Sequence, residues 1–275
     1  MRNIHIYMAK IAHRLLPLAV MSMAGTATAD WLDAVSSEQA EQPHWVTPLV
    51  TVTPRLEQEY RVDDLDTRLA SGTWVNNLGN GKGLELIAPG LPVELAVSGP
   101  GYISSADAHH PQGYSDSSFL LKWRLCSAAE GEGNYIVTAF MGGSLPTGSR
   151  YLGNAAAIYT PSLAVGKGWG AFAVQSTLGY TLPVTAVPRL GHSLLSNTSL
   201  QWHLGSWWPE MEYNQTTYRD GPWSGQRQGL VTAGVIWRHP LRRRIGLVLG
   251  FGYQKPVTRF TTQDRTLIAT ARLPF

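Results

Sequence analysis

Hydrophobic and polar residues alternate with a period of two along most of the chain. In one block, Leu121, Trp123 and Leu125 alternate with Lys122 and Arg124. Successive side chains of a β-strand point to opposite faces, so this pattern predicts strands with one apolar and one polar face. Beyond residue 29 the chain contains no apolar run of the roughly 20 residues that a membrane-spanning helix needs. The pattern therefore predicts an all-β protein.

Blocks of about ten alternating residues are expected for tilted strands that cross an outer membrane. Twelve such blocks can be recognised: Trp45–Val62, Gly83–Ala88, Pro92–Ile103, Ser117–Leu125, Asn134–Leu145, Ala156–Val165, Trp169–Leu182, Leu190–Leu204, Trp207–Thr217, Gln228–Arg238, Arg244–Tyr253 and Arg265–Phe275. Short connections alternate with longer ones, of which residues 63–82 form the longest. We therefore predict a transmembrane antiparallel β-barrel of about 12 strands with both chain ends on the periplasmic side. The alternative is a soluble β-sandwich, which also alternates.

The N-terminus has the features of a cleavable signal peptide. A basic region with Arg2, Lys10 and Arg14 precedes an apolar core at residues 15–21, and an A-x-A cleavage motif follows at Ala27–Ala29. We predict cleavage before Asp30. The chain then divides into a signal peptide (residues 1–29), a periplasmic tail (30–44) and an outer-membrane barrel (45–275).

Charge and cysteine content exclude several classes of function. Removing residues 1–29 takes three of the 22 basic residues and none of the 19 acidic ones, which leaves 19 of each. This zero net charge argues against a nucleic-acid partner. The single cysteine, Cys126, rules out an intramolecular disulfide and any metal site built from several cysteines; we predict that it lies in or near a short turn. We expect no metal and no cofactor.

The C-terminal residues alternate up to a terminal aromatic residue. Leu273 and Phe275 share one face with Ala271, while Arg272 lies on the other. This arrangement resembles the C-terminal strand signature of bacterial outer-membrane barrels. It predicts location in the cell outer membrane, contact with outer-membrane lipids, and recognition by the barrel-assembly machinery through the strand that ends at Phe275.

The polar faces of the predicted strands carry charges of both signs. Hydrocarbon disfavours charge, so these residues are expected to face the lumen. The pore-lining candidates are Arg55, Glu57, Glu59, Glu85, Glu94, Lys122, Arg124, Glu210, Glu212 and Arg272. They could form ion pairs that fill a narrow barrel, or a polar constriction that selects solutes; the two are compatible.

Two short motifs resemble a known family. The strand Ser118–Leu125 contains the basic pair Lys122 and Arg124, and one hairpin later the run Leu145, Pro146, Thr147 and Gly148 begins a loop. This combination resembles the MetA-pathway of phenol degradation family, over about residues 47–275. The resemblance implies an outer-membrane barrel associated with uptake of aromatic or other hydrophobic compounds, and it implies no catalytic residues.

The predicted function is therefore a passive channel or transporter-like barrel for small solutes, including aromatic or hydrophobic ones, and not an enzyme. Only about fifteen residues separate the predicted cleavage site from the first predicted strand, so we expect no energy-coupling plug domain. One alternative is a lipid hydrolase that uses Ser193 and His192, with His203 and Glu210 or Glu212 nearby in sequence. Adjacent strand residues point to opposite faces, which argues against a Ser193–His192 pair. Another alternative is a closed structural barrel without transport.

Overall fold

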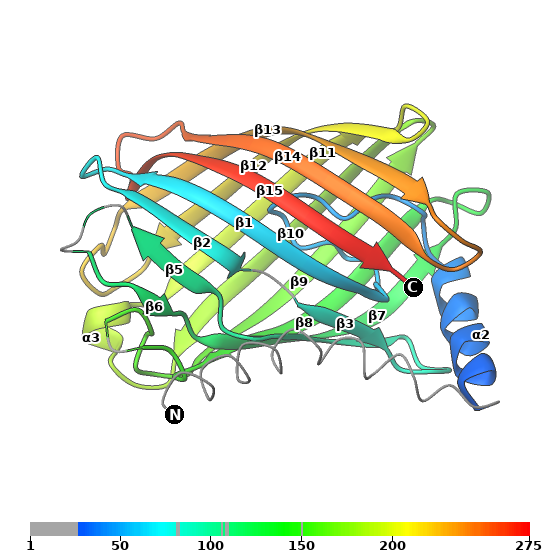
Figure 1. Cartoon of the computed structure of the whole chain (residues 1–275), viewed down its shortest axis with the longest axis horizontal. Coiled ribbons are helices and arrows are strands. Elements are labelled where there is room, and N and C mark those ends of the chain that lie inside the picture. Colours follow the sequence, from blue (N-terminus) through cyan, green and yellow to red (C-terminus); the bar gives the residue numbers. More distant parts are fainter. Residues whose placement is uncertain (1–26, 81–82, 106, 108–109, 150) are drawn as a thin grey trace, which may run out of the picture.

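The chain folds into one antiparallel sheet that closes on itself. The structure, a computed structural model, describes residues 27–275 except 81–82, 106, 108–109 and 150. Strand β1 (Glu59–Leu69) pairs with β15 (Gln263–Pro274), in a register that runs from Glu59 opposite Pro274 to Leu69 opposite Gln263. Figure 1 shows the two strands side by side in the barrel wall. A closed sheet leaves no backbone edge unpaired, as hydrocarbon requires.

Three positions around the barrel are each built from two separate strands. They are β2 (Trp74–Asn80) with β3 (Leu84–Ile87), β4 (Val93–Ser98) with β5 (Tyr102–Ser105), and β6 (Gly113–Tyr114) with β7 (Ser117–Ala128). The other strands are continuous: β8 (Tyr135–Leu145), β9 (Ile158–Trp169), β10 (Phe172–Pro183), β11 (Ser193–Trp202), β12 (Trp207–Tyr218), β13 (Arg227–Pro240) and β14 (Gly246–Pro256). Counted by position, the barrel has twelve strands, which confirms the predicted fold class.

The outer surface of the barrel is apolar and the inner surface is largely polar. In β7, Leu121 and Trp123 are exposed while Lys122 and Arg124 are buried; in β14, Phe251 is exposed on the outside. Apolar residues facing outward and polar residues facing inward are the pattern of barrels that lie in lipid. No helix within the described part of the chain is long and apolar enough to cross a membrane.

The two ends of the barrel differ in their connections. Only Gly170 and Ala171 separate β9 from β10, whereas residues 146–157 separate β8 from β9, and helix α3 (Val187–Leu190) lies in another long connection. Short turns mark the periplasmic end of outer-membrane barrels, and longer loops mark the external end. Helix α2 (Ala27–Ala40) and the C-terminus lie at the end with the short turns, called the periplasmic end below (Figure 1).

Residues 41–58, called the internal segment, lie inside the barrel. They contain no helix or strand, and most of their side chains are buried. Trp45, Val46 and Leu49 form a hydrophobic core with inward-facing residues of the barrel wall, among them Ile136 and Ile236. The barrel is therefore filled, over part of its length, by the chain that precedes its first strand.

The predicted first strand, Trp45–Val62, is wrong, since β1 begins only at Glu59. Residues 45–58 fold inside the barrel: Trp45, Val46 and Leu49 pack in the internal core, while Thr51 and Thr53 bond to side chains of the barrel wall. Pro48 and Pro54 lack the N–H groups that a paired strand would use. The predicted tail (30–44) likewise contains most of α2. Residues 1–26 of the predicted signal peptide lie outside the described residues.

The predicted long loop at residues 63–82 is also wrong, because β1 continues to Leu69 and turns directly into β2. Its many charged residues are typical of a loop in sequence, but several have partners in the strand: Asp63 forms an ion pair with Arg61 on the inside, and Arg68 forms one with Asp264. The predicted number of twelve strands is still correct, because β1 of this hairpin takes the place of the predicted first strand. The other eleven predicted blocks overlap strands of the structure.

Cys126 lies near the β7–β8 turn, as predicted, but not in it. It belongs to β7, where it is exposed beside a β-bulge between Arg124 and Cys126. The small and polar residues 127–133 that follow it are typical of a turn. The backbone of β7 nevertheless stays paired with β8 as far as Ala128.

Candidate functional site

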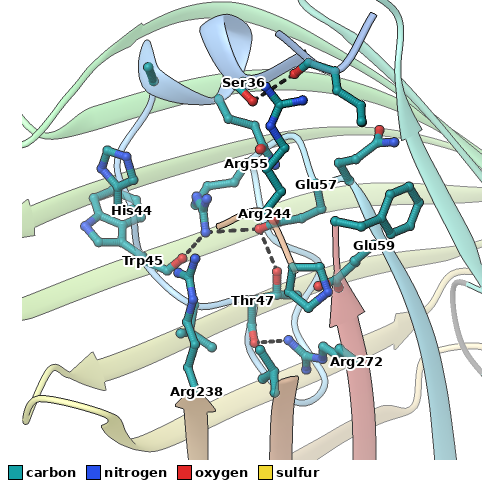
Figure 2. Close-up of a pocket in the computed structure, with 18 of the residues that line it drawn as sticks. Ser36, His44, Trp45, Thr47, Arg55, Glu57, Glu59, Arg238, Arg244 and Arg272 are labelled. Atoms are coloured by element: carbon teal, nitrogen blue, oxygen red, sulfur yellow. Dashed lines mark hydrogen bonds and ion pairs between the residues drawn. The ribbon is translucent and has the colours of Figure 1, made fainter. Parts of the chain in front are cut away.

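The internal segment enters the barrel at the periplasmic end and folds back on itself to reach β1. Its two limbs are joined at the base, where the Gln42 side chain donates to the Leu56 carbonyl over 2.7 Å and accepts from the Leu56 N–H over 2.9 Å. The Thr47 hydroxyl donates to Glu57 over 2.9 Å, and Arg55 donates to the Trp45 carbonyl (Figure 2). These bonds hold the segment as a closed loop that is not part of the sheet.

Two glutamates of β12 bind the tip of this loop through its backbone. Glu210 accepts the Leu49 N–H over 2.9 Å. Glu212 accepts the N–H groups of Val50 and Thr51, with one carboxylate oxygen each, over 2.8 and 2.5 Å. Three consecutive backbone donors, which the segment cannot satisfy internally, are thus paired with buried carboxylates.

Two arginines bind the carbonyl groups of the same stretch. Arg272 of β15 donates to the carbonyls of Thr47 and Pro48 over 2.5 and 2.8 Å. Arg61 of β1 donates to the Leu49 carbonyl over 2.7 Å. The N–H groups of the tip are therefore bound by carboxylates and its carbonyl groups by guanidinium groups, in addition to the contacts that its side chains make.

A lysine and a glutamate bind the returning limb. Lys122 of β7 donates to the Arg55 carbonyl over 2.9 Å, and Glu94 of β4 accepts the Glu57 N–H over 2.5 Å. Lys122 also forms ion pairs with Glu94 at 3.0 Å and with Glu85 at 3.7 Å, and the side chains of all three are fully buried. This cluster couples β3, β4 and β7 to the internal segment.

Glycines in the barrel wall make room for apolar side chains of the segment. A Cβ atom built on Gly234, Gly250 or Gly252 would lie 2.4 to 2.7 Å from the end of the Leu49 side chain. A Cβ atom on Gly166 would lie 2.4 Å from the Trp45 ring. Leu49 and Trp45 therefore sit in recesses of the inner surface that larger residues would fill.

The base of the segment is attached to the periplasmic end. Arg124 forms ion pairs with Glu38 and Glu41 at the end of α2 and just beyond it, at 2.8 and 2.7 Å. His44 bonds to Glu130 in the β7–β8 turn through its ring at 2.8 Å and its N–H at 2.7 Å. Partial burial raises the pKa of Glu130, but the bonds from His44 outweigh it and hold that pKa below its ordinary value.

The ten charged residues predicted to line the pore are all buried inside the barrel. Eight lie on inward faces of strands, whereas Arg55 and Glu57 belong to the internal segment. The structure brings Glu85, Glu94 and Lys122 together, and it places Glu210, Glu212 and Arg272 around the tip. Arg124 stands apart beside α2, and Glu59 begins β1. Most of these side chains bind the internal segment or α2; their role in lining an open pore stays a prediction.

Several residues of this site were not predicted. Arg61 was on the polar face of the first block, but its partner could not be foreseen. Uncharged residues also bind the segment: Thr138, Thr177 and Gln175 donate to the carbonyls of Pro54, Val52 and Val46 at 2.5, 2.9 and 3.0 Å. The glycines on the inner face of β14 were a further signal, since a wide polar lumen does not need them.

The L-P-T-G run organises the external loops. Asp116 accepts the N–H groups of Gly148 and Asn154, both at 2.8 Å. A Cβ atom on Gly148 would lie 2.8 Å from the Asp116 carboxylate and 2.9 Å from the Cα of Gly153. The glycine of the motif is therefore required for close packing of two loops.

The residues considered for lipid hydrolysis do not form a catalytic set. His192 bonds to Asp220 at 2.6 Å, and this bond with a second one from the His192 N–H holds the pKa of Asp220 below its ordinary value. Among the described residues, no hydrogen bond joins Ser193 to His192. His203 stacks on Trp208, with 4.2 Å between the two ring centroids. Among the described residues it forms no hydrogen bond with Ser193 or His192. Glu210 and Glu212 are occupied by the internal segment.

Comparison with known proteins identifies the fold. No family model and no curated protein matches the sequence. Among solved structures, the barrel resembles the COG4313 outer membrane channel from Pseudomonas putida F1, with a TM-score of 0.55, 14% identity, and coverage of 79% of this chain and 94% of that chain. It also resembles the NanC porin, with a TM-score of 0.51, 6% identity, and coverage of 79% and 98%. Both are channels or porins. The chain therefore has the closed, antiparallel twelve-strand fold of outer-membrane channels.

Proposed function

We propose that the protein is a passive channel for small solutes across the outer membrane, and that the internal segment is its gate. The observation that carries this proposal is the way the tip is held. Glu210, Glu212, Arg61 and Arg272 bind only backbone atoms of the segment, and no strand pairing attaches it to the sheet.

The wall beneath the segment supports a gate rather than a permanent filling. Buried ion pairs stabilise a protein little compared with well-packed apolar residues, so a barrel that is always closed gains little from them. A charged wall, in contrast, remains solvated if the segment leaves and water enters. Glu94, Lys122 and Arg272 would then line a polar pore, as the sequence predicts.

Weakening the tip contacts should open the channel. In Glu210→Gln/Glu212→Gln, each amide keeps one acceptor oxygen but loses the charge, and one backbone N–H of the tip loses its partner. A charge-assisted hydrogen bond contributes about 1.5–3 kcal/mol, so the open fraction should rise about tenfold or more. Single-channel recording in planar lipid bilayers measures this fraction.

The matched control is Glu132→Gln, which removes a carboxylate from an exposed position in the β7–β8 turn. It should leave the recordings unchanged. A double variant that folds but opens no more often than the original protein would contradict the gate and favour a closed structural barrel.

The resemblance to the MetA-pathway of phenol degradation family supports aromatic or hydrophobic compounds as candidate solutes. The route to the membrane that we propose is export by the signal peptide, followed by recognition of β15 and Phe275 by the barrel-assembly machinery. Both proposals rest on sequence features and are independent of the gate.

A further inference from the structure

A cavity of about 280 Å³ lies at the periplasmic mouth, between α2, the internal segment and the barrel wall (Figure 2). Its wall is strongly basic. Five arginines line it, against two glutamates: Arg55, Arg238, Arg243, Arg244 and Arg272, with Glu57 and Glu59. A concave site with an excess of guanidinium groups attracts anions.

Not all of these arginines are engaged. Arg272 binds the segment, and Arg244 pairs with Asp33 of α2. Within the described residues, however, neither Arg238 nor Arg243 has a hydrogen-bond or ion-pair partner. Two cationic groups with all their donors free therefore face the cavity.

Arg55 adds a buried donor that lacks a partner. The exposed fraction of its side chain is 6%, and its Nε has no hydrogen-bond partner among the described residues. Figure 2 shows the guanidinium of Arg238 directed toward that of Arg55. Glu57 forms an ion pair with Arg55 at 3.1 Å, so the charge of Arg55 is already offset in part, whereas no carboxylate among the described residues forms an ion pair with Arg238.

We propose that this cavity binds a small anion with a carboxylate or phosphate group, held by Arg55, Arg238 and Arg243. The volume is at the lower end of the range for ligand sites, which suits a small molecule. Guanidinium groups bind carboxylates and phosphates through paired N–H donors, and such bonds are stronger than those between neutral groups. The anion joins the internal segment, through Arg55, to the barrel wall, through Arg238.

The site does not depend on conduction, but it has a consequence for the proposed gate. A ligand that binds only when the segment is in place stabilises that arrangement. The anion therefore favours the closed barrel. Binding can be measured on a barrel that never opens, so failure of the gate and failure of this site are distinguishable.

The test is isothermal titration calorimetry of inorganic phosphate into the detergent-solubilised protein at constant ionic strength. Arg238→Gln and Arg243→Gln should each weaken binding about tenfold, the effect of losing a charge-assisted contact. The matched control is Arg242→Gln, which removes an equal charge from the same turn but does not line the cavity. It should bind phosphate as the original protein does. Arg243 is exposed in the turn, so its replacement does not endanger folding.

A second arm identifies the source of the anion. Titration is repeated with phosphatidylglycerol incorporated in the micelles. Loss of phosphate binding would assign the site to a lipid headgroup, and unchanged binding would assign it to a soluble anion. No measurable phosphate binding, or equal weakening by Arg242→Gln, would overturn the proposal.

Discussion

Leu49 shows how single residues decide what fills the barrel. Its side chain ends against Gly234, Gly250 and Gly252, while its N–H and carbonyl bind Glu210 and Arg61. One residue thus combines an apolar contact with two charge-assisted hydrogen bonds. The inner surface is shaped for this particular side chain, because the glycines leave the space that it occupies.

Gly250→Ala should therefore displace the tip. The new Cβ would lie 2.7 Å from both the Leu49 Cδ2 and the Thr270 Cγ2, and 3.3 Å from the Ile236 Cγ1. The added methyl group would therefore be too close to three neighbouring side chains. Overpacking of this kind costs about 1–3 kcal/mol. We expect a lower free energy of unfolding in urea titrations, and faster proteolysis of the internal segment.

The control is Gly246→Ala in the same strand, where the nearest atoms are 3.6 Å from the new Cβ. It should resemble the original protein. Equal stability and equal proteolysis of the two variants would show that the recess for Leu49 does not hold the segment.

At the scale of elements, the structure separates what alternation can predict from what it cannot. Eleven blocks were predicted from period-two patterning because each strand meets lipid on one side and the interior on the other. The first block has a different environment: it lies inside the barrel, where Leu49 packs in the core and Thr51 and Thr53 bond to the wall. Pro48 and Pro54 were the available signal that it is not a central strand.

The Lys122 cluster joins three strands to the internal segment, so it tests how strongly these elements depend on one another. Lys122→Met removes the bond to the Arg55 carbonyl and leaves the buried Glu94 carboxylate without its cation. Breaking a buried pair in this way costs about 3–5 kcal/mol. We expect that loss in the free energy of unfolding, measured by urea titration.

Adding Glu94→Gln to Lys122→Met should restore part of the stability, because one of the two carboxylates that lost their cation is gone and only Glu85 remains. Stability of the double variant no higher than that of Lys122→Met would contradict the assignment of the ion pair.

For the whole molecule, the fold class could be predicted from the sequence, whereas the segment that fills the lumen could not. Strand patterning, the C-terminal strand signature and the loop asymmetry all point to a twelve-strand barrel. A barrel of this size is wider than one that its own side chains fill. What occupies the space is decided by contacts between residues far apart in sequence, such as Val50 with Glu212, and no periodicity encodes them.

The central claim is that the internal segment blocks conduction while it is bound inside the barrel and permits conduction when it leaves the barrel wall. A reversible tether tests this on a single barrel. Leu49→Cys/Gly252→Cys in a Cys126→Ser background places two thiols where the Leu49 side chain now meets Gly252; apart from Leu49, the nearest atom to the new Cβ is the Thr232 Cγ2 at 3.3 Å. Single-channel current is recorded under oxidising conditions and again after a reductant is added. The account predicts silence when the disulfide is formed and discrete openings after reduction. Current that persists through the oxidised barrel, or silence in both states, would contradict it.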